Sequence, residues 1–202
     1  MLCALGLQAQ TLKKVSEAQA KAMVEQINQT AAAIKTLACD FTQVKSLHFL
    51  NDKMTSEGKM YYDGSGKLRW EYTSPYSYTF ILNGQQVYIK SAKSTHTIDI
   101  RQSKLFQSIA QVMMNSVTGK SLTSGSDFTT VLYTQGSAWV AELTPKKKEM
   151  KQMFKTIRLY FDSTRQMVSQ VEMTEQSGDQ TVITLKHVKT NGKMDANLFV
   201  GR

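Results

Sequence analysis

The chain has 202 residues, of which 41% are hydrophobic and 20% charged, and only two are prolines. This composition excludes an intrinsically disordered chain, and the length suffices for one domain with a well-buried core. The formal net charge of +9 comes mostly from lysines spread along the sequence. In the densest basic run, residues 146–158, the basic residues do not alternate with aromatic residues in the way that favours nucleic acid as a partner.

The chain begins with an apolar, uncharged stretch that ends in small and polar residues, MLCALGLQAQ. This pattern is typical of the end of a secretory signal peptide that is cleaved after Ala9. We therefore predict a residual signal segment at residues 1–9 and a single exported domain at residues 10–202; a buried first strand is the alternative. Cys3 would leave with the signal, so Cys39 would be the only cysteine and could form no intramolecular disulfide.

The first element predicted after the signal is a long amphipathic helix at residues 13–37. No proline or glycine interrupts this segment, and alanines fill the positions between its larger apolar residues. These recur at spacings typical of one helical face: Val15, Met23, Ile27, Ile34 and Leu37. The apolar face must therefore lie on another element.

After Cys39 the sequence changes to short extended runs separated by turn residues. Runs at 41–49 and 58–63 come first, and the turn signals Asp63-Gly64-Ser65-Gly66 and Asn83-Gly84 predict antiparallel hairpins. Further runs follow beyond Asp127, at 128–133, 139–144, 156–161, 167–174, 181–188 and 197–200. Their regular spacing predicts a meander that curls into a barrel or half-barrel.

One of the early runs, GKLRWEYTSPY at residues 66–76, has a clearly apolar face. Side chains alternate along a strand, so Leu68, Trp70 and Tyr72 point to one side and Arg69 to the other. Periodicity alone does not decide whether the apolar side faces a filled core or a space kept open for an apolar ligand.

Two segments differ from this strand pattern. Residues 104–117 have apolar residues at helical spacing and end before Gly119, which predicts a second, shorter helix. Its methionines fit either core filling or a mobile apolar surface. Residues 146–158 form the densest basic run, which fits either a solvated lysine-rich loop or a surface for phosphates, lipid headgroups or an acidic partner.

Residues that could carry catalysis or bind a metal are isolated from one another. His48, His96 and His187 have no second ligand at helical or loop spacing, and no serine lies in a G-x-S-x-G motif. Asp162 and Asp179 fall in predicted turns, where aspartate supports the backbone geometry. No metal, cofactor or enzymatic activity is therefore predicted, and the prominent apolar and aromatic residues favour a binding protein.

Several motifs follow one another along the chain in a specific order. After the amphipathic helix come Phe41-Thr42-Gln43, Gly58-Lys59-Met60-Tyr61-Tyr62, Leu68-Arg69-Trp70-x-Tyr72-x-x-Pro75, Asn83-Gly84, Leu143-Thr144-Pro145-Lys146 and Asn191-Gly192-Lys193-Met194-Asp195-Ala196-Asn197-Leu198-Phe199. From residue 12 to residue 200 the sequence resembles the periplasmic outer-membrane lipoprotein carrier family, the LolA-like proteins.

The resemblance implies an α+β fold, namely an unclosed, strongly curved antiparallel β-barrel with helices covering the concave face. It implies a monomeric periplasmic carrier that takes acylated lipoproteins from an inner-membrane lipoprotein-releasing ABC transporter. The carrier would deliver their acyl chains, held in a hydrophobic cavity, to an outer-membrane acceptor, which is a protein or the membrane itself. No covalent chemistry and no cofactor are implied.

The resemblance also suggests which residues line the cavity. Leu68 and Trp70 match family positions on the concave face, whereas the other candidates share the inward direction by strand alternation: Tyr72, Met60, Tyr62, Phe80 and Leu82. The helical lid would draw on Ile109, Val112 and Met113.

The sequence departs from the family pattern at the turn before Leu68. Family members usually carry an Arg-Pro pair there, and the arginine is thought to latch the lid in the empty state. Here Gly64 and Ser65 take these places, so the latch is absent or supplied elsewhere. Arg69 points to the opposite side of its strand and would hold the strand or meet a partner on the outer face.

Three alternative functions are compatible with the sequence. The same fold could serve as an outer-membrane receptor, although that would need a lipid-anchor cysteine that this N-terminus does not supply. It could also detect mislocalised lipoproteins, although such sensors usually have a further domain. A periplasmic enzyme acting on lipids or glycans would require a titratable pair in the cavity, and the sequence marks none.

Overall fold

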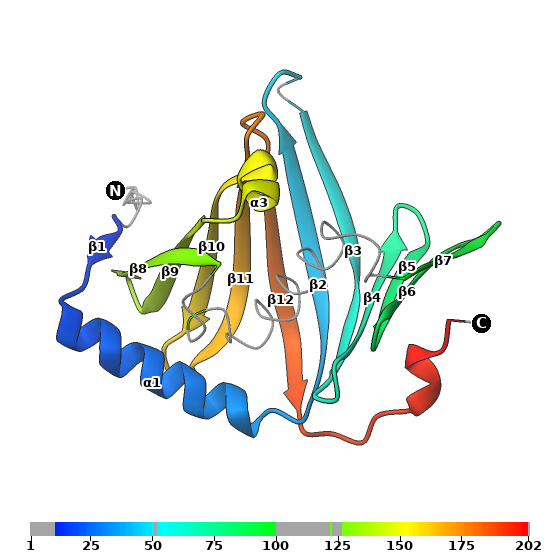
Figure 1. Ribbon diagram of the computed structural model, residues 1–202, viewed down its shortest axis with the longest axis horizontal. Coiled ribbons are helices and arrows are strands. Elements are labelled where there is room, and N and C mark those ends of the chain that lie inside the picture. Colours follow the sequence, from blue (N-terminus) through cyan, green and yellow to red (C-terminus); the bar gives the residue numbers. More distant parts are fainter. Residues whose placement is uncertain (1–10, 51, 100–121, 123–126, 202) are drawn as a thin grey trace, which may run out of the picture.

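The computed structural model describes residues 11–50, 52–99, 122 and 127–201 of the chain. Within these ranges, twelve antiparallel strands form one strongly curved sheet (Figure 1). The strand order is β1-β8-β9-β10-β11-β12-β2-β3-β4-β5-β6-β7, so β1 and β7 are the two edges and the sheet does not close. This confirms the predicted unclosed antiparallel half-barrel.

The sheet consists of two consecutive meanders that meet where β12 pairs with β2. The first meander contains β2 (Thr36–Leu47), β3 (Asp52–Asp63), β4 (Lys67–Ser74), β5 (Tyr78–Asn83), β6 (Gln86–Ser91) and β7 (Thr95–Asp99). The second contains β8 (Phe128–Gln135), β9 (Ala138–Pro145), β10 (Phe154–Asp162), β11 (Met167–Glu175) and β12 (Gln180–Thr190). The two-residue strand β1 (Lys13–Lys14) pairs with β8.

The predicted turns join these strands, but two strands begin earlier than predicted. Gly66 and Gly84 have φ angles of 92° and 60°, which glycine adopts without strain, at the β3–β4 and β5–β6 turns. The strands predicted at 41–49 and 58–63 pair continuously from Thr36 opposite Asp63 to Leu47 opposite Asp52. Backbone pairing therefore extends through polar residues that carry no strand pattern.

The predicted helix at residues 13–37 is wrong at both ends, because α1 comprises only Glu17–Ala33. At its start, the Ser16 side chain accepts a hydrogen bond from the Gln19 N–H, and the Gln19 side chain accepts one from the Ser16 N–H. This capping box fixes the first turn. At the other end, Ile34 is already extended, and the apolar spacing continues into β2.

Two short helices complete the described structure. α3 (Lys148–Met153) precedes β10, and the 3₁₀ helix η3 (Ala196–Phe199) lies near the C-terminus. The strand predicted at 197–200 is therefore wrong. The Asp195 side chain accepts a hydrogen bond from the Asn197 N–H at 2.9 Å, which favours a helical turn over an extended segment.

The predicted lid segment, residues 104–117 with Ile109, Val112 and Met113, lies outside the described residues. Its helical structure and its contact with the cavity remain predictions. Within the described ranges, no helix combines the length and the apolar composition needed to cross a membrane.

Buried apolar side chains from both meanders and from α1 form a single cluster. Met23 and Ile27 bring the buried face of α1 against it, where α1 crosses one end of the second meander (Figure 1). From the sheet itself, Phe41, Leu68 and Leu159 are each at most 1% exposed. Removal of these side chains from water provides the main stabilisation of the fold.

The C-terminal segment covers the outer face of β4, β5 and β6, which is the face opposite to the buried cluster. Arg69 Nη1 donates to the Leu198 carbonyl and Asn83 Nδ2 to the Phe199 carbonyl, both at 3.2 Å. Phe199 is buried, and Gly201 lies directly against the ring of Tyr88. Arg69 is thus on the outer face, as predicted, and it holds the C-terminal segment against the sheet.

Candidate functional site

The cavity residues predicted on three strands lie on one face of the first meander. Met60 on β3 is opposite Trp70 on β4, which is opposite Phe80 on β5. The next row has the same order: Tyr62, Leu68 and Leu82. Residues that are directly opposite on neighbouring strands share a face of the sheet.

Tyr72 completes the predicted set, since it follows Trp70 by two positions on β4. The β-bulge between Glu57 and Gly58 does not separate it from the others, and Tyr72 lies opposite Gly58 on β3 and Tyr78 on β5. Five members of the set belong to the buried apolar cluster, whereas Tyr72 and Phe80 are partly buried and pack against it. The structure thus brings all seven side chains together.

Phe41 is the central residue of this face that the sequence analysis did not select. Its ring centroid lies 4.6 Å from that of Trp70 and 5.2 Å from that of Tyr72, the latter pair at 86°. Edge-to-face contact of this kind is a favourable arrangement for aromatic rings. Leu37, Cys39 and Phe41 occupy every second position of β2 and therefore share one face. This alternation of apolar residues in the sequence could have identified Phe41.

Gly58 makes the approach of Phe41 possible. A Cβ atom at this position would overlap the carbonyl oxygen of Glu71 and lie 2.6 Å from Cζ of Phe41. Only a residue without a side chain lets β3 pass between β2 and β4 while the Phe41 ring covers it.

Two polar groups are embedded in this apolar face. The Tyr72 hydroxyl donates to Gln43 Oε1 at 3.0 Å, and burial raises the pKa of Tyr72 above its ordinary value. Trp70 is 5% exposed, and its buried indole N–H is directed at the Tyr72 hydroxyl without reaching full hydrogen-bond geometry with any described residue. A buried donor without an acceptor is costly, so this N–H lowers the stability of the face in which it lies.

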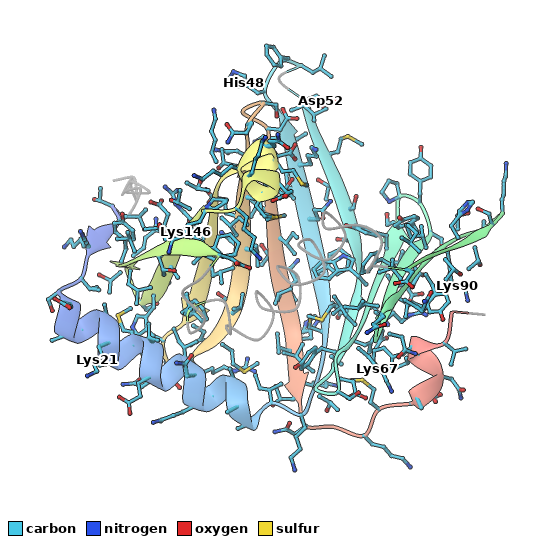
Figure 2. All side chains as sticks on the ribbon, in the orientation of Figure 1. Lys21, His48, Asp52, Lys67, Lys90 and Lys146 are labelled. Atoms are coloured by element: carbon cyan, nitrogen blue, oxygen red, sulfur yellow. The ribbon has the colours of Figure 1, made fainter. Side chains whose placement is uncertain are left out.

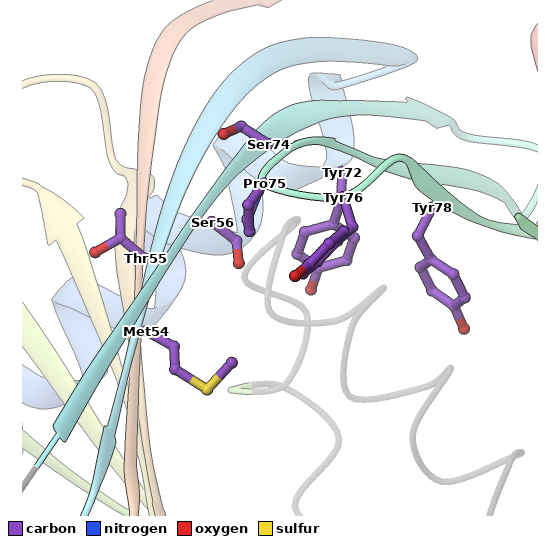
Figure 3. A pocket seen from close by; sticks show the side chains of 8 residues that line it. All are labelled: Met54, Thr55, Ser56, Tyr72, Ser74, Pro75, Tyr76 and Tyr78. Atoms are coloured by element: carbon purple, nitrogen blue, oxygen red, sulfur yellow. The ribbon is translucent and has the colours of Figure 1, made fainter. Parts of the chain in front are cut away.

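The apolar face continues into an open pocket of about 480 Å³ between the start of β3 and the β4–β5 loop (Figure 3). Its lining residues are Met54, Thr55, Ser56, Tyr72, Ser74, Pro75, Tyr76 and Tyr78. Tyr72 belongs both to this pocket and to the buried aromatic group, and its ring lies 6.1 Å from that of Tyr78. The volume falls within the range of pockets that hold small ligands.

The whole-chain comparison identifies the family. The family described as "Outer membrane lipoprotein carrier protein LolA" matches residues 32–201. The chain belongs to the LolA family.

Curated relatives agree with this assignment at low identity. An outer-membrane lipoprotein carrier protein of Legionella pneumophila (strain Paris) is 25% identical over 184 residues, which cover 91% of this chain and 85% of the relative. A protein of the same name from Methylococcus capsulatus is 26% identical over 169 residues, 82% of this chain and 76% of the relative.

Solved structures confirm the fold of this LolA-family chain. An uncharacterised conserved protein of Thermus thermophilus has a TM-score of 0.53 at 9% identity, covering 89% of this chain and 92% of that protein. MucB has a TM-score of 0.50 at 11% identity, covering 92% of this chain and 63% of MucB. At such identities the likeness concerns the fold alone.

The turn at Gly64, where the family resemblance places the latch arginine, is attached to the end of α1. The Gly64 N–H donates to the Lys35 carbonyl at 2.7 Å, and a Cβ atom at Gly64 would lie 3.0 Å from that oxygen. The turn therefore ties the β3–β4 hairpin to the segment after α1. A larger residue would disturb this contact.

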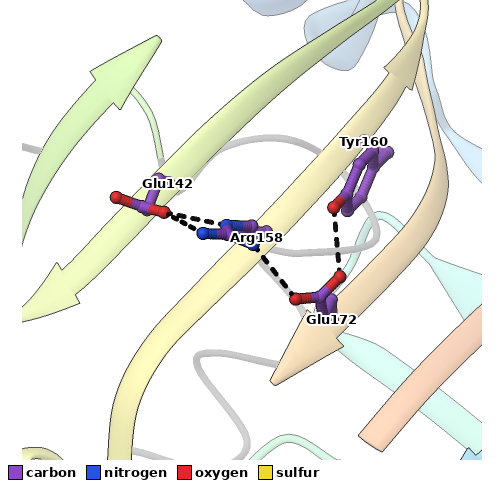
Figure 4. Close-up of polar contacts among 4 residues, drawn as sticks. All are labelled: Glu142, Arg158, Tyr160 and Glu172. Carbon is purple, nitrogen blue, oxygen red and sulfur yellow. Dashed lines mark hydrogen bonds and ion pairs between the residues drawn. The ribbon is translucent and has the colours of Figure 1, made fainter. Parts of the chain in front are cut away.

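The basic run at 146–158 of this LolA-family chain is not a loop throughout, because residues 148–153 form the helix α3. Met150 is the buried residue of this helix. Arg158 lies on β10 and is held between Glu142, 2.7 Å from its Nη2, and Glu172, 3.3 Å from its Nη1 (Figure 4). The prediction of a solvated loop is thus wrong for α3 and for Arg158. The other basic residues of the run are exposed.

Cys39 lies on the apolar face opposite Met60 and has no disulfide partner among the described residues. Burial, and to a smaller extent the neighbouring Asp40 carboxylate, raises the pKa of its thiol from 9.0 to about 12. The thiolate is therefore disfavoured in the folded protein relative to the unfolded chain.

We expect this pKa shift to make stability fall at alkaline pH. The raised pKa contributes stability that is fully present below pH 9 and is lost as pH rises towards about 12. Between about pH 8 and pH 10 the free energy of unfolding should fall by about 1.4 kcal/mol more than in a Cys39→Ala variant. Urea unfolding of both proteins at the two pH values measures this difference, and equal losses would exclude Cys39 as its source.

Proposed function

We propose that this LolA-family protein is a periplasmic carrier that binds the acyl chains of lipoproteins and moves them from the inner to the outer membrane. The observation that supports this most strongly is the apolar face of β3, β4 and β5, which shares Tyr72 with the open pocket. Family membership and the names of the curated relatives support the same function.

The energetics of acyl transfer require such a surface. Each methylene group left in water costs about 0.8 kcal/mol, so a chain of roughly sixteen carbons would cost on the order of 12 kcal/mol if it were unshielded. A carrier must offset most of this cost with apolar contacts, yet release the chain at its destination.

We propose that the seven residues of the apolar face line the acyl site and that Ile109, Val112 and Met113 cover it. The domain at residues 10–202 would act as a monomer without cofactor or catalytic step. Its partners would be the inner-membrane lipoprotein-releasing ABC transporter and an outer-membrane acceptor.

The direct test is to express the chain in a bacterial periplasm, purify it and identify bound molecules by mass spectrometry. We expect acylated lipoproteins to be recovered with it. Recovery of empty protein, or of free phospholipid alone, would argue against the carrier function.

A variant pair tests the assignment of the apolar face. Phe80→Gln should lower the affinity for a fluorescent palmitoyl probe about tenfold, because a partly buried aromatic contact with the chain is lost. Tyr61→Gln is the matched control, since Tyr61 is a half-buried aromatic residue on the opposite face of β3. Equal losses of affinity in the two variants would show that the acyl chain does not bind at Phe80.

A further inference from the structure

The β2–β3 hairpin ends in two strongly exposed apolar side chains. Phe49 is 86% exposed and Leu50 is 71% exposed, the highest and third-highest values among the large hydrophobic residues described. Figure 2 shows this tip, between the labelled residues His48 and Asp52, projecting from one end of the molecule. Water contact at this tip is unfavourable, and the fold itself gains nothing from it.

The tip is held in its projecting position by the β11–β12 turn. The His48 N–H donates to Asp179 Oδ1 at 2.9 Å. A Cβ atom at Gly178 would lie 3.2 Å from the His48 ring, so turn and ring are in close contact. The His48 ring also meets the Phe49 ring edge-on, with centroids 5.5 Å apart. His48 therefore fills the space against the turn and leaves Phe49 pointing outward.

The same turn joins the tip to α3. Gln176 Nε2 donates to the Lys151 carbonyl at 2.7 Å, and the Gln176 N–H donates to the Met153 carbonyl at 3.0 Å. Figure 1 shows α3, the β11–β12 turn and the β2–β3 tip at the same end of the sheet. We call this surface the docking end and define it by Phe49, Leu50, the β11–β12 turn and α3.

The exposed charged residues of the docking end are mostly lysines, whereas its acids are equal in number but mostly half-buried. Lys53, Lys148 and Lys151 are exposed, and no carboxylate among the described residues pairs with them. Two nearby acids already have partners, since Glu175 pairs with Lys45 and Asp127 with Lys147. Three further acids belong to the surface: Asp179, which accepts from His48, the half-buried Glu149 and the exposed Asp52.

We propose that the docking end binds the surface of a lipid bilayer that carries anionic headgroups, with Phe49 and Leu50 inserted among the lipids. A projecting tip of two apolar residues is too small for the core of a stable protein interface, which needs a broad complementary surface. It suits insertion at the boundary of headgroups and acyl chains, where lysines beside it contact anionic lipids.

The position of the pocket agrees with this orientation. Met54 lines the open pocket and lies at the start of β3, directly after the hairpin tip. When the tip is inserted, the pocket opening therefore lies close to the bilayer. This inference is independent of the proposed cargo, because it concerns where the protein binds and not what it carries.

The test is flotation of the full chain with protein-free vesicles of phosphatidylcholine, with and without phosphatidylglycerol. We expect binding to the phosphatidylglycerol vesicles that weakens as salt is added. Phe49→Ser with Leu50→Ser should reduce this binding at least about tenfold. Both side chains are exposed, so the double variant should fold normally, which its thermal unfolding will verify.

Matched controls separate the docking end from general charge and hydrophobicity. Replacing Lys53, Lys148 and Lys151 by Gln should also reduce binding at least about tenfold. Each lysine near an anionic membrane surface contributes at most about fivefold to the affinity. The control replaces Lys21, Lys35 and Lys193, exposed lysines outside the docking end, by Gln, and a second control is Val200→Ser at an exposed apolar residue. Both controls should leave binding almost unchanged.

Three results would overturn the proposal. One is unchanged binding after replacement of Phe49 and Leu50, and another is an equal loss in the control lysine variant. The third is binding to native membranes but not to protein-free vesicles, which would indicate a protein partner in place of lipid. All variants keep the same N-terminal residues, so that the apolar start of the chain contributes equally to each measurement.

Discussion

Trp70→Glu is expected to lower the free energy of unfolding by about 4 kcal/mol or more, because it removes a large buried side chain and introduces a charge. Trp70 is 5% exposed, and its ring lies against Phe41 at 4.6 Å. A carboxylate at this position would have no basic partner on the apolar face of β3, β4 and β5. Urea unfolding followed by circular dichroism measures the loss.

Trp70→Phe is the control that separates packing from hydrogen bonding. It keeps a six-membered aromatic ring and removes the five-membered ring of the indole with its N–H, which has no acceptor at full hydrogen-bond geometry among the described residues. Its cost should therefore be limited to the missing ring volume, about 1–2 kcal/mol. If Trp70→Glu is as stable as the parent protein and still binds acyl cargo, the assignment of Trp70 to the buried apolar face is wrong.

Gly58→Ala is the second substitution with a large expected effect, although it adds a single methyl group. The new Cβ atom would overlap the Glu71 carbonyl and press on the Phe41 ring. Because one of these contacts is backbone, β3 and β4 must separate locally. We expect a loss of about 3 kcal/mol in the free energy of unfolding, at the upper end of the cost of overpacking.

Gly192→Ala provides the matched control for the added methyl group. A Cβ atom at Gly192 meets nothing within 4 Å, so this substitution should change stability by less than about 0.5 kcal/mol. Thermal unfolding of the two variants side by side gives the comparison. Similar melting temperatures for both would mean that the Phe41 ring does not occupy the space above Gly58.

The strand content of the fold was predictable because its turn residues are explicit, as Gly66 and Gly84 illustrate. The apolar face of β4 was likewise predictable, since alternation at Leu68, Trp70 and Tyr72 continues without interruption. The ends of α1 were not predictable from spacing. Ile34 and Leu37 fit a helical repeat with the residues before them, although both are buried in extended backbone.

Other parts depend on contacts that a local pattern does not contain. α3 spans six residues with one buried side chain, Met150, which is too short for a periodic signal. The strand-like segment at 197–200 is helical because of the Asp195 cap. Met54 and Tyr76 line one pocket only because of the β3–β4 register, which shifts by one residue at the bulge between Glu57 and Gly58.

The pairing of β2 with β12 has a consequence for the order of folding. Thr42 lies opposite Thr184, whereas almost every other ladder joins strands that are consecutive in the chain. Hairpins between consecutive strands form quickly, whereas the pairing of strands that are distant in the chain carries a large loop-closure cost. During refolding, amide protons of the β2–β12 ladder should therefore become protected from exchange last. Until then both halves of the apolar surface remain uncovered, and the chain is most prone to aggregate at this stage.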